Sequence, residues 1–323
     1  MANIYIVDSI YEHHFQSPEV ESLILPGHDI ALKHISTSAD LEQLPLESID
    51  VLLLWACVPS ITINQSILNR LEQCRAIIKV AVGFENIDLQ QARRRNIDVF
   101  NVPDYGTEEV ADHALALLLS MARKINYMDR ATKMNGWSWA EIKPTYRLRG
   151  RTLGIIGFGR IGGAVARRVQ PFGMKACFYD PYVPSGIEKT FGVVRCENLN
   201  DLIEESDCIS IHCALNDSSH HLLGREQFAR MKHGTLVINT ARGGIVDSSA
   251  LLQALNSGIV AMAGLDVLEG EPALDARFRD SGRVILTAHS AFYSEESFRE
   301  MRETSATMAK AVLSGTKPRN IVN

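Results

Sequence analysis

The stretch TLGIIGFGRIGGAVARRV, residues 152–169, decides the fold. A short apolar run is followed at once by Gly157, Gly159 and Gly162 in the spacing G-x-G-x-x-G, and a helix-compatible segment comes next. Gly157 permits a tight turn, Gly159 lets the backbone approach a pyrophosphate, and Gly162 allows the helix to pack closely on the strand. The amide groups at the helix N-terminus would attract the phosphates. The stretch therefore predicts a strand, turn and helix that bind a dinucleotide.

An acidic residue at the end of the next apolar run supports this interpretation. Asp180 lies 18 positions after Gly162, and the combination of strand, helix and acid makes the glycine motif specific. We expect Asp180 to accept hydrogen bonds from the adenosine ribose and to repel the extra phosphate of NADP, so that NAD(H) is preferred. Arg160 and Ile161 are further expected cofactor contacts. The alternative is that the glycines only serve turns and packing.

Short apolar runs recur along the chain and predict an α/β fold. In the second half they lie at 152–156, 175–179, 208–213, 235–238, 260–265 and 283–287, and most of the segments between them are long enough for a helix. Such spacing predicts a doubly wound parallel sheet of six strands, because parallel neighbours need a crossover. Up to about Pro103, four similar runs predict a smaller parallel domain. Helical periodicity predicts helices over 107–128 and 294–313.

Composition excludes several classes of protein. The 323 residues suggest two domains at roughly 150 residues each, and the net charge of -5 leaves no basic excess for nucleic acid or an anionic membrane. We find no secretion signal and no apolar run near the roughly 20 residues of a membrane helix. A reduced, cytoplasmic protein without a metal fits the six cysteines, none of which forms a C-x-x-C pair: Cys57, Cys74, Cys177, Cys196, Cys208 and Cys213.

Three polar side chains follow strands of the second sheet and suggest hydride-transfer chemistry on a 2-oxo or 2-hydroxy acid. The fork of donors on Arg242 suits a carboxylate and its neighbouring carbonyl. His289 is a residue type that exchanges protons near neutrality, and Glu271 would orient its ring and favour the imidazolium. Taken singly, each residue is more often a surface or core residue. Behind a dinucleotide fold, their combination favours catalysis.

Other strand ends offer candidate cofactor contacts. Asn239 and Thr240 follow the run 235–238, and Asp266 follows the run 260–265. Because ligands of an open parallel sheet bind beyond the carboxyl ends of its strands, we expect these three residues to face the cofactor. Asp266 is placed to bind the carboxamide of nicotinamide, although it would equally cap the following turn.

Four segments resemble the D-2-hydroxyacid dehydrogenase family: LGIIGFGRIG with YDPY after it, NTARGGIVD, AGLDVLEGEP and TAHSAFYSEESFREMR. The resemblance extends from about Val80 to the C-terminus. Within the family, YDPY, LNDSSHHLL at 215–223, HSAFYSEES and the terminal NIVN are most similar to the C-terminal binding protein (CtBP-like) branch. The motifs together are highly specific.

The resemblance implies a catalytic trio that falls on Arg242, Glu271 and His289. It also implies two Rossmann-like or flavodoxin-like domains with the active site in the cleft between them. The substrate-binding domain would be discontinuous, 1–103 plus 293–323, and the NAD-binding domain would span 104–292. The loop at Val82 and Gly83 matches the family's substrate loop, whose amides would bind the carboxylate. Family members are usually homodimers through the nucleotide domain.

Two departures affect the expected substrate. The CtBP-like branch has Arg at the position of Lys79 and Trp at the position of Phe292, and both positions would face substrate. Trp55 either lines the same pocket or packs in the core. The leading hypothesis is an NAD-dependent oxidoreductase that reduces a 2-oxo acid to the D-2-hydroxy acid. The alternatives are an NADH-sensing, CtBP-like interaction protein and an enzyme acting on an inorganic or one-carbon acid.

Overall fold

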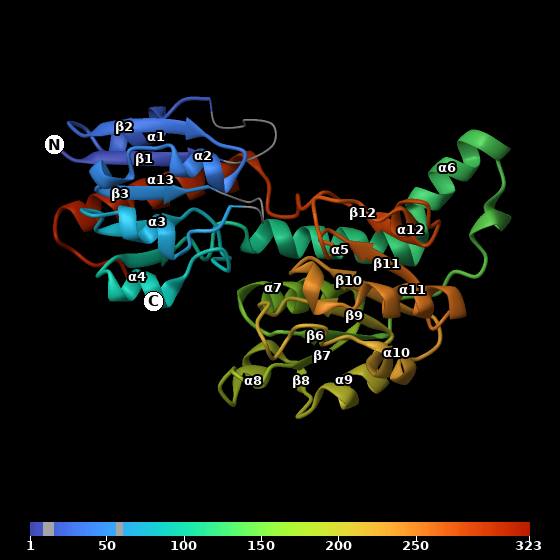
Figure 1. Ribbon diagram of the computed structural model, residues 1–323. Helices are drawn as coiled ribbons and strands as arrows, with labels where there is room; N and C mark the ends of the chain where they lie inside the picture. Colours follow the sequence, from blue (N-terminus) through green and yellow to red (C-terminus); the bar gives the residue numbers. More distant parts are fainter. Residues whose placement is uncertain (9–15, 56–60) are drawn as a thin grey trace. The chain divides into compact units, whose positions relative to one another are not determined.

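The computed structural model describes residues 1–8, 16–55 and 61–323, so that Cys57 lies outside the described residues. The chain divides into two compact units, each built around one sheet (Figure 1). The first unit comprises Met1–Tyr105 and Ser294–Asn323, and the second comprises Gly106–Tyr293. These divisions lie within two residues of the expected domain ends.

The first unit holds a five-stranded parallel sheet in the order β2-β1-β3-β4-β5, which is the flavodoxin-like order. Its core consists of aliphatic side chains from the strands and helices, such as Leu52, Ile77 and Val99. The strand β2 was not predicted, and its partly exposed edge position explains its weak apolar pattern. The elements are β1 (Asn3–Asp8), α1 (Glu19–Ile24), β2 (Asp29–His34), α2 (Ser38–Glu42), β3 (Val51–Leu54), α3 (Gln65–Arg70), β4 (Ala76–Lys79), α4 (Leu89–Arg94), β5 (Asp98–Asn101) and α13 (Glu295–Leu313).

The C-terminal segment returns to this first unit. In α13, Phe298 packs on Trp55 with ring centroids 5.1 Å apart, and Arg302 donates to the fully buried Glu21 of α1 at 2.7 Å. Beyond α13, the Val322 amide donates to the Val99 carbonyl of β5. Apolar packing, a buried ion pair and backbone bonds thus join the two ends of the chain into one unit.

The second unit holds a seven-stranded parallel sheet in the order β12-β11-β10-β9-β6-β7-β8. The chain runs outward from β6 in one direction and from β9 in the other, as in a Rossmann fold, so the order reverses between these two strands. The predicted α/β class with two parallel sheets is therefore confirmed. The two-residue β8 is too short for a sequence pattern to reveal. The strands are β6 (Thr152–Ile156), β7 (Lys175–Tyr179), β8 (Val194–Arg195), β9 (Cys208–Ile211), β10 (Thr235–Asn239), β11 (Val260–Leu265) and β12 (Val284–Leu286).

The helix expected over 107–128 is wrong in its extent. The helix α5 (Thr107–Arg123) ends where Lys124 takes a left-handed backbone with φ 53°, and α6 (Ile125–Asn135) begins anew. Figure 1 shows α6 standing away from the sheet, and Ala131 is its buried residue. The other helices of this unit are α7 (Arg160–Val169), α8 (Ile187–Phe191), α9 (Leu199–Glu205), α10 (Arg225–Arg230), α11 (Ser248–Ser257) and α12 (Ala276–Arg279).

The described helices differ in length or in apolar character from a membrane-spanning helix. Within 1–8, 16–55 and 61–323, no helix combines the length and the apolar character needed to cross a bilayer. The cytoplasmic location expected from the sequence stays a prediction.

Candidate active site

The glycine turn lies where the strand order of the second sheet reverses. Gly157, directly after β6, has φ 88°, and a Cβ there would lie 2.4 Å from the backbone nitrogen of Cys213, beyond β9. Only glycine fits such a backbone and such an approach. The two strands therefore present their carboxyl ends together at the point where open α/β sheets bind ligands.

The rest of the motif forms the start of α7. Gly159 is the N-cap of the helix, Arg160 and Ile161 are its first residues, and Gly162 is buried within it. Gly159 and Arg160 are exposed, so the first backbone amides of α7 are accessible at the sheet edge. This is the arrangement in which helix N-termini bind phosphate groups.

Asp180 follows β7 and braces the glycine turn. Its Oδ2 accepts a hydrogen bond from the Phe158 amide at 2.8 Å, and its Oδ1 accepts one from the Tyr182 amide at 2.9 Å. A carboxylate oxygen has more than one acceptor direction, so these bonds leave Asp180 able to accept from ribose hydroxyls as well. The same carboxylate therefore both shapes the turn and suits the expected ribose contact.

Two buried polar atoms lie at neighbouring strand ends of the second sheet. Among the described residues, Oγ1 of Thr240 and Nδ1 of His212 are buried without a hydrogen-bond partner. Buried polar atoms are normally paired, so a polar ligand at this edge would satisfy them. Burial lowers the pKa of His212 to about 3, which keeps its ring neutral. His212 was not predicted, because we assigned it to the strand 208–213. The strand ends two residues earlier, at Ile211, and the strand-end argument applied there finds His212.

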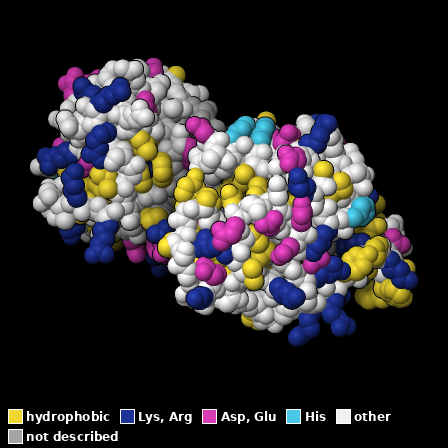
Figure 2. Space-filling view, turned by 90° about the horizontal axis from the view of Figure 1, so that it is seen from below, with side chains coloured by type: hydrophobic (Ala, Val, Ile, Leu, Met, Phe, Trp, Pro, Cys, Tyr) yellow, Lys and Arg dark blue, Asp and Glu magenta, His cyan; other side chains and the backbone are white. Residues whose placement is uncertain are grey.

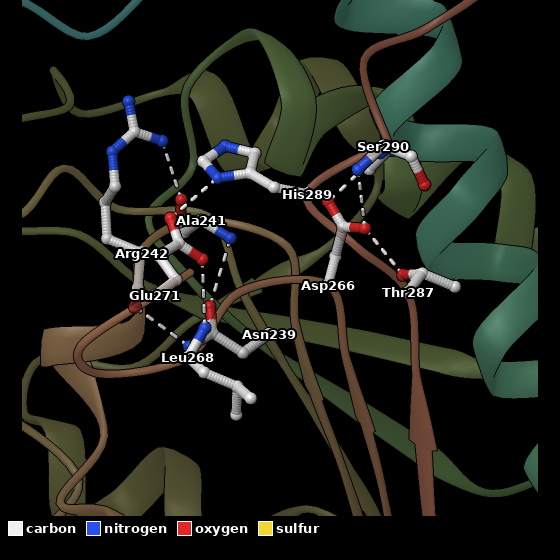
Figure 3. Close-up of polar contacts among 10 residues, drawn as sticks. Asn239, Ala241, Arg242, Asp266, Leu268, Glu271, Thr287, His289 and Ser290 are labelled. Carbon is white, nitrogen blue, oxygen red and sulfur yellow. Dashed lines mark hydrogen bonds and ion pairs between the residues drawn. The ribbon is translucent and has the colours of Figure 1, made fainter. Parts of the chain in front are cut away.

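The central pair of the site is His289 with Glu271. His289 Nδ1 and Glu271 Oε1 lie 2.7 Å apart (Figure 3), and the Leu268 amide donates to Glu271 Oε2 at 3.2 Å. Burial alone would raise the pKa of Glu271. The hydrogen bond and charge of His289, the Leu268 amide and the charge of Arg242 outweigh it, so that this pKa lies below its usual range. Because Nδ1 faces the carboxylate, Nε2 is the ring atom left for a reacting group.

Arg242 is held beside this pair by the turn that follows β10. Asn239, 1% exposed, donates through Nδ2 to the Arg242 carbonyl at 2.9 Å and accepts from the Ala241 amide at 3.0 Å. A Cβ on Gly243 would lie 2.0 Å from the Leu268 carbonyl carbon, so only glycine allows the turn to approach the loop that carries Glu271. The NH2 group and the oxygen of the Asn239 side-chain amide therefore both hold the turn.

Asp266 holds the backbone around His289. Its carboxylate accepts from the Ser290 and Ala291 amides, both at 3.0 Å, and from the Thr287 hydroxyl at 2.5 Å (Figure 3). His113 of α5 contacts the same hydroxyl at 2.9 Å. His289 itself has a left-handed backbone with φ 50°, which is uncommon for a residue with a side chain. Asp266 thus holds the turn around His289, which is a different turn from the one directly after Asp266 that the sequence suggested.

The predicted substrate residues are divided between the units. In the first unit, Lys79 is buried at the end of β4, and Trp55 is 1% exposed against Phe298, a core position. The amides of Val82 and Gly83 have no acceptor among the described residues, while the Val82 carbonyl accepts from Asn101 at 2.8 Å. Two such amides in succession suit an anion. In the second unit, Phe292 is half-buried beside Gly106.

The fold and site define a dinucleotide-binding oxidoreductase, and comparison with known proteins gives its family. Residues 115–291 match the NAD-binding domain of D-isomer-specific 2-hydroxyacid dehydrogenases. The chain is 40% identical over 265 residues, 81% of its length, to a glyoxylate reductase of Korarchaeum cryptofilum, 80% of which is covered. The chain therefore belongs to the D-isomer-specific 2-hydroxyacid dehydrogenase family, and the predicted family and NAD-dependent enzyme class are confirmed.

Solved structures show the same architecture along nearly the whole chain. A D-lactate dehydrogenase of Aquifex aeolicus, complexed with NAD and lactic acid, superposes with a TM-score of 0.85 at 27% identity, covering 97% of this chain and 96% of the other. A D-mandelate dehydrogenase of Rhodotorula graminis gives a TM-score of 0.88 at 26% identity, covering 100% and 98%. NAD(H) is the cofactor of the family, as predicted.

Proposed function

We propose that this enzyme catalyses the reversible reduction of a 2-oxo acid to the D-2-hydroxy acid, with Arg242, Glu271 and His289 as its catalytic residues. The observation that carries the proposal is the 2.7 Å contact between His289 and Glu271 on the sheet edge that also presents Arg242. A base oriented by a carboxylate beside a fixed cation matches the needs of a carbonyl that becomes an alkoxide.

The cofactor would lie along the carboxyl edge of the second sheet. The amides of Gly159, Arg160 and Ile161 would bind the pyrophosphate, with Gly157 and Gly162 shaping the turn around it. Asp180 would bind the adenosine ribose. Thr240 and His212 offer unpaired polar atoms to the remainder of the molecule, whereas Asn239 and Asp266 act by holding the turns beside it. When bound in its reduced form, NADH supplies the hydride.

The protein's own side chains would move the proton and stabilise the charge that develops on the substrate. Arg242 holds the substrate carboxylate and polarises the carbonyl through its fork of donors. His289, bonded to Glu271 through Nδ1, donates the proton on Nε2 to the carbonyl oxygen during reduction and takes it back during oxidation. Glu271 stays ionised and stabilises the imidazolium that each cycle requires.

The first unit would supply substrate recognition. We assign the substrate carboxylate to the Val82 and Gly83 amides together with Arg242, and the remainder of the substrate to Lys79 and to Phe292, which belongs to the second unit. The buried packing of Trp55 on Phe298 supports a core role for that residue. Since Lys79 lacks the bidentate fork of the Arg found in the CtBP-like branch, we propose a substrate range different from that branch and an enzymatic rather than a partner-binding role.

A panel of 2-oxo acids tests this function. NADH absorbance is followed with glyoxylate, pyruvate, hydroxypyruvate, phenylpyruvate and branched or thioether-bearing chains, with NADPH as the control cofactor. Turnover of at least one acid to the D-hydroxy product is the expected result. Tight NADH binding without turnover of any acid would contradict the proposal and favour an NADH-sensing role instead.

Asp180→Asn is expected to relax the preference for NADH. The amide oxygen can keep one of the two bonds that brace the turn, whereas the NH2 group cannot accept the other, and the change removes the charge that repels the additional phosphate of NADPH. We expect the ratio of kcat/KM for NADPH to that for NADH to rise by about tenfold or more, equivalent to about 1.4 kcal/mol. Glu197→Ala, which removes an exposed acid of the same unit, is the control, and an equal ratio in both variants would disprove the assignment of Asp180.

We also propose a homodimer formed through α6 and the segment after it. Trp137 is 97% exposed, and five other large apolar side chains from Ile125 to Tyr146 are 43–77% exposed. Figure 2 shows hydrophobic side chains gathered at the edge of the second unit where α6 lies. A monomer rarely exposes such a cluster, and the expected dimer of the family forms through this unit. A second copy of this chain is therefore the partner that we assign to the exposed apolar side chains of α6 and the segment after it.

The double variant Trp137→Asp, Trp139→Asp is expected to be monomeric. Aromatic side chains dominate the binding energy of interfaces, and removing one commonly costs about 2 kcal/mol or more, so two charged replacements should weaken the dimer by several hundredfold or more. Light scattering after size exclusion gives the mass. Val194→Asp, at an exposed apolar position of β8, is the matched control. A monomeric wild-type protein would rule out the dimer.

A further inference from the structure

Three side chains of residue types that can bind metal ions lie close together outside the catalytic trio. His220, His221 and Glu269 each place a ligand atom within 4.8 Å of the others. His221 Nε2 lies 2.6 Å from Glu269 Oε1, and the rings of the two histidines stack with centroids 4.0 Å apart. Spacing along the chain does not reveal this group, because Glu269 lies 48 residues beyond His221.

The backbone is arranged so that both rings lie on one side. Consecutive side chains of an extended chain point in opposite directions, but His221 has a left-handed backbone with φ 49°. Its amide is fixed by a 2.8 Å hydrogen bond to the Gly244 carbonyl. Such backbones are uncommon in residues other than glycine and concentrate at functional sites.

We propose that His220, His221 and Glu269 bind a divalent transition-metal ion of the Zn²⁺ type, with water completing its coordination. Two imidazole nitrogens and a carboxylate oxygen form a ligand set that suits Zn²⁺ and its neighbours better than Mg²⁺ or Ca²⁺. The partial exposure of all three side chains leaves room for water.

Coordination requires the exposed His220 ring to rotate out of its stack on His221, because an imidazole binds a metal ion in the plane of its ring, whereas His221 and Glu269 need to move little. At metal–ligand distances of about 2 Å in a tetrahedral site, two ligand atoms lie about 3.3 Å apart, so the contact between His221 and Glu269 would open by less than 1 Å. Glu269 Oε2 accepts a hydrogen bond from the Ser248 amide at 2.9 Å, which orients the carboxylate as second-layer partners of metal ligands do. Oε1 is left to face the ion.

An ion at this position would join three separate segments of the second unit. His220 and His221 belong to the connection after β9, Glu269 to the loop after β11, and Ser248 begins α11. Because the ion would bind the folded state alone, it should raise Tm by an amount that grows with the logarithm of the free Zn²⁺ concentration above Kd. The site goes beyond the proposed function, since its ligands are not members of the catalytic trio.

Titration calorimetry with Zn²⁺, in saturating NADH, tests the site in the full-length protein. One ion per chain is expected. His220→Ala and Glu269→Gln should each weaken binding by roughly 100-fold or more, since even indirect partners of a metal ligand are worth 10-fold to 100-fold. His233→Ala, which removes another exposed histidine of this unit, should bind as the wild type does.

Thermal unfolding supplies a second readout. At a Zn²⁺ concentration 100 times its Kd, the wild-type Tm should rise by roughly 5 °C, and the rise should vanish in His220→Ala. This variant is informative because the His220 side chain makes no hydrogen bond to the described residues, so its removal should leave the metal-free Tm nearly unchanged. Unaltered Zn²⁺ affinity in His220→Ala, or loss of binding in His289→Asn instead, would overturn the proposal.

Discussion

Replacing Arg242 by Ala is expected to lower kcat/KM by about 10³-fold for every 2-oxo acid the enzyme accepts, with NADH affinity nearly unchanged. A fixed donor to the developing alkoxide is commonly worth 10²-fold to 10³-fold, and Arg242 would also hold the carboxylate. The turn that carries it is held by two hydrogen bonds of Asn239, which remain when the Arg242 side chain and its own bond to the Ala241 carbonyl are removed. The substitution should therefore remove the charge and leave the turn in place.

Steady-state kinetics measures the loss of kcat/KM, and NADH fluorescence titration measures the affinity for the cofactor separately. Arg242→Lys retains a cation without the bidentate fork, so it should recover only part of the lost activity. Arg225→Ala removes an arginine from the first turn of α10 in the same unit and should leave kcat/KM at the wild-type value. An Arg242→Ala protein that turns over at the wild-type rate would disprove the assignment of the substrate-binding cation.

His289→Ala is expected to lower kcat by about 10²-fold to 10⁴-fold and to flatten its pH dependence near neutrality. Glu271 has a lowered pKa because His289, the Leu268 amide and Arg242 together outweigh burial. Its charge therefore persists to a lower pH than that of an ordinary carboxyl group and is lost only as the pH falls through that lowered pKa. A pH dependence near neutrality should thus come from a group other than Glu271, and its loss in His289→Ala would identify His289 as that group.

Profiles of kcat against pH for the three variants and the wild-type protein complete this test. Glu271→Gln should reduce kcat less than His289→Ala while retaining a pH dependence, because the ring would lose its orienting carboxylate but keep its proton. His233→Ala, at an exposed position of the same unit, should reproduce the wild-type profile. If His289→Ala kept the wild-type pH dependence, a different group would have to be the general acid.

Much of the candidate site follows from residues that stand directly after strands. The glycine motif and Asp180 occupy consecutive strand ends of the second sheet, and Arg242 follows β10 in the same manner. Strand ends are predictable because a parallel sheet must place its carboxyl ends on one edge. Glu271 lies farther from its strand, and its role was supported by the resemblance to the family as well.

Other features depended on packing that no local pattern encodes. The strand β2 escaped prediction because an edge strand buries little of either face. The expected long helix was divided at Lys124, since apolar periodicity continues across a single left-handed residue without recording it. The position of Trp55 was open until Phe298, near the other end of the chain, was seen to cover it.

The sequence by itself determined the fold class, the nucleotide turn and the identity of the proposed catalytic trio. These depend on periodicity, on glycine and on residue chemistry, which are local properties of the chain. Only the tertiary structure decided which atoms meet: Nδ1 of His289 with Glu271, Asp266 with the amides behind that histidine, and His221 with Glu269. The physical reason is that hydrogen bonds and ligand sets require distances of a few ångströms between residues far apart in sequence. Folding of the whole unit sets those distances, and spacing along the chain does not.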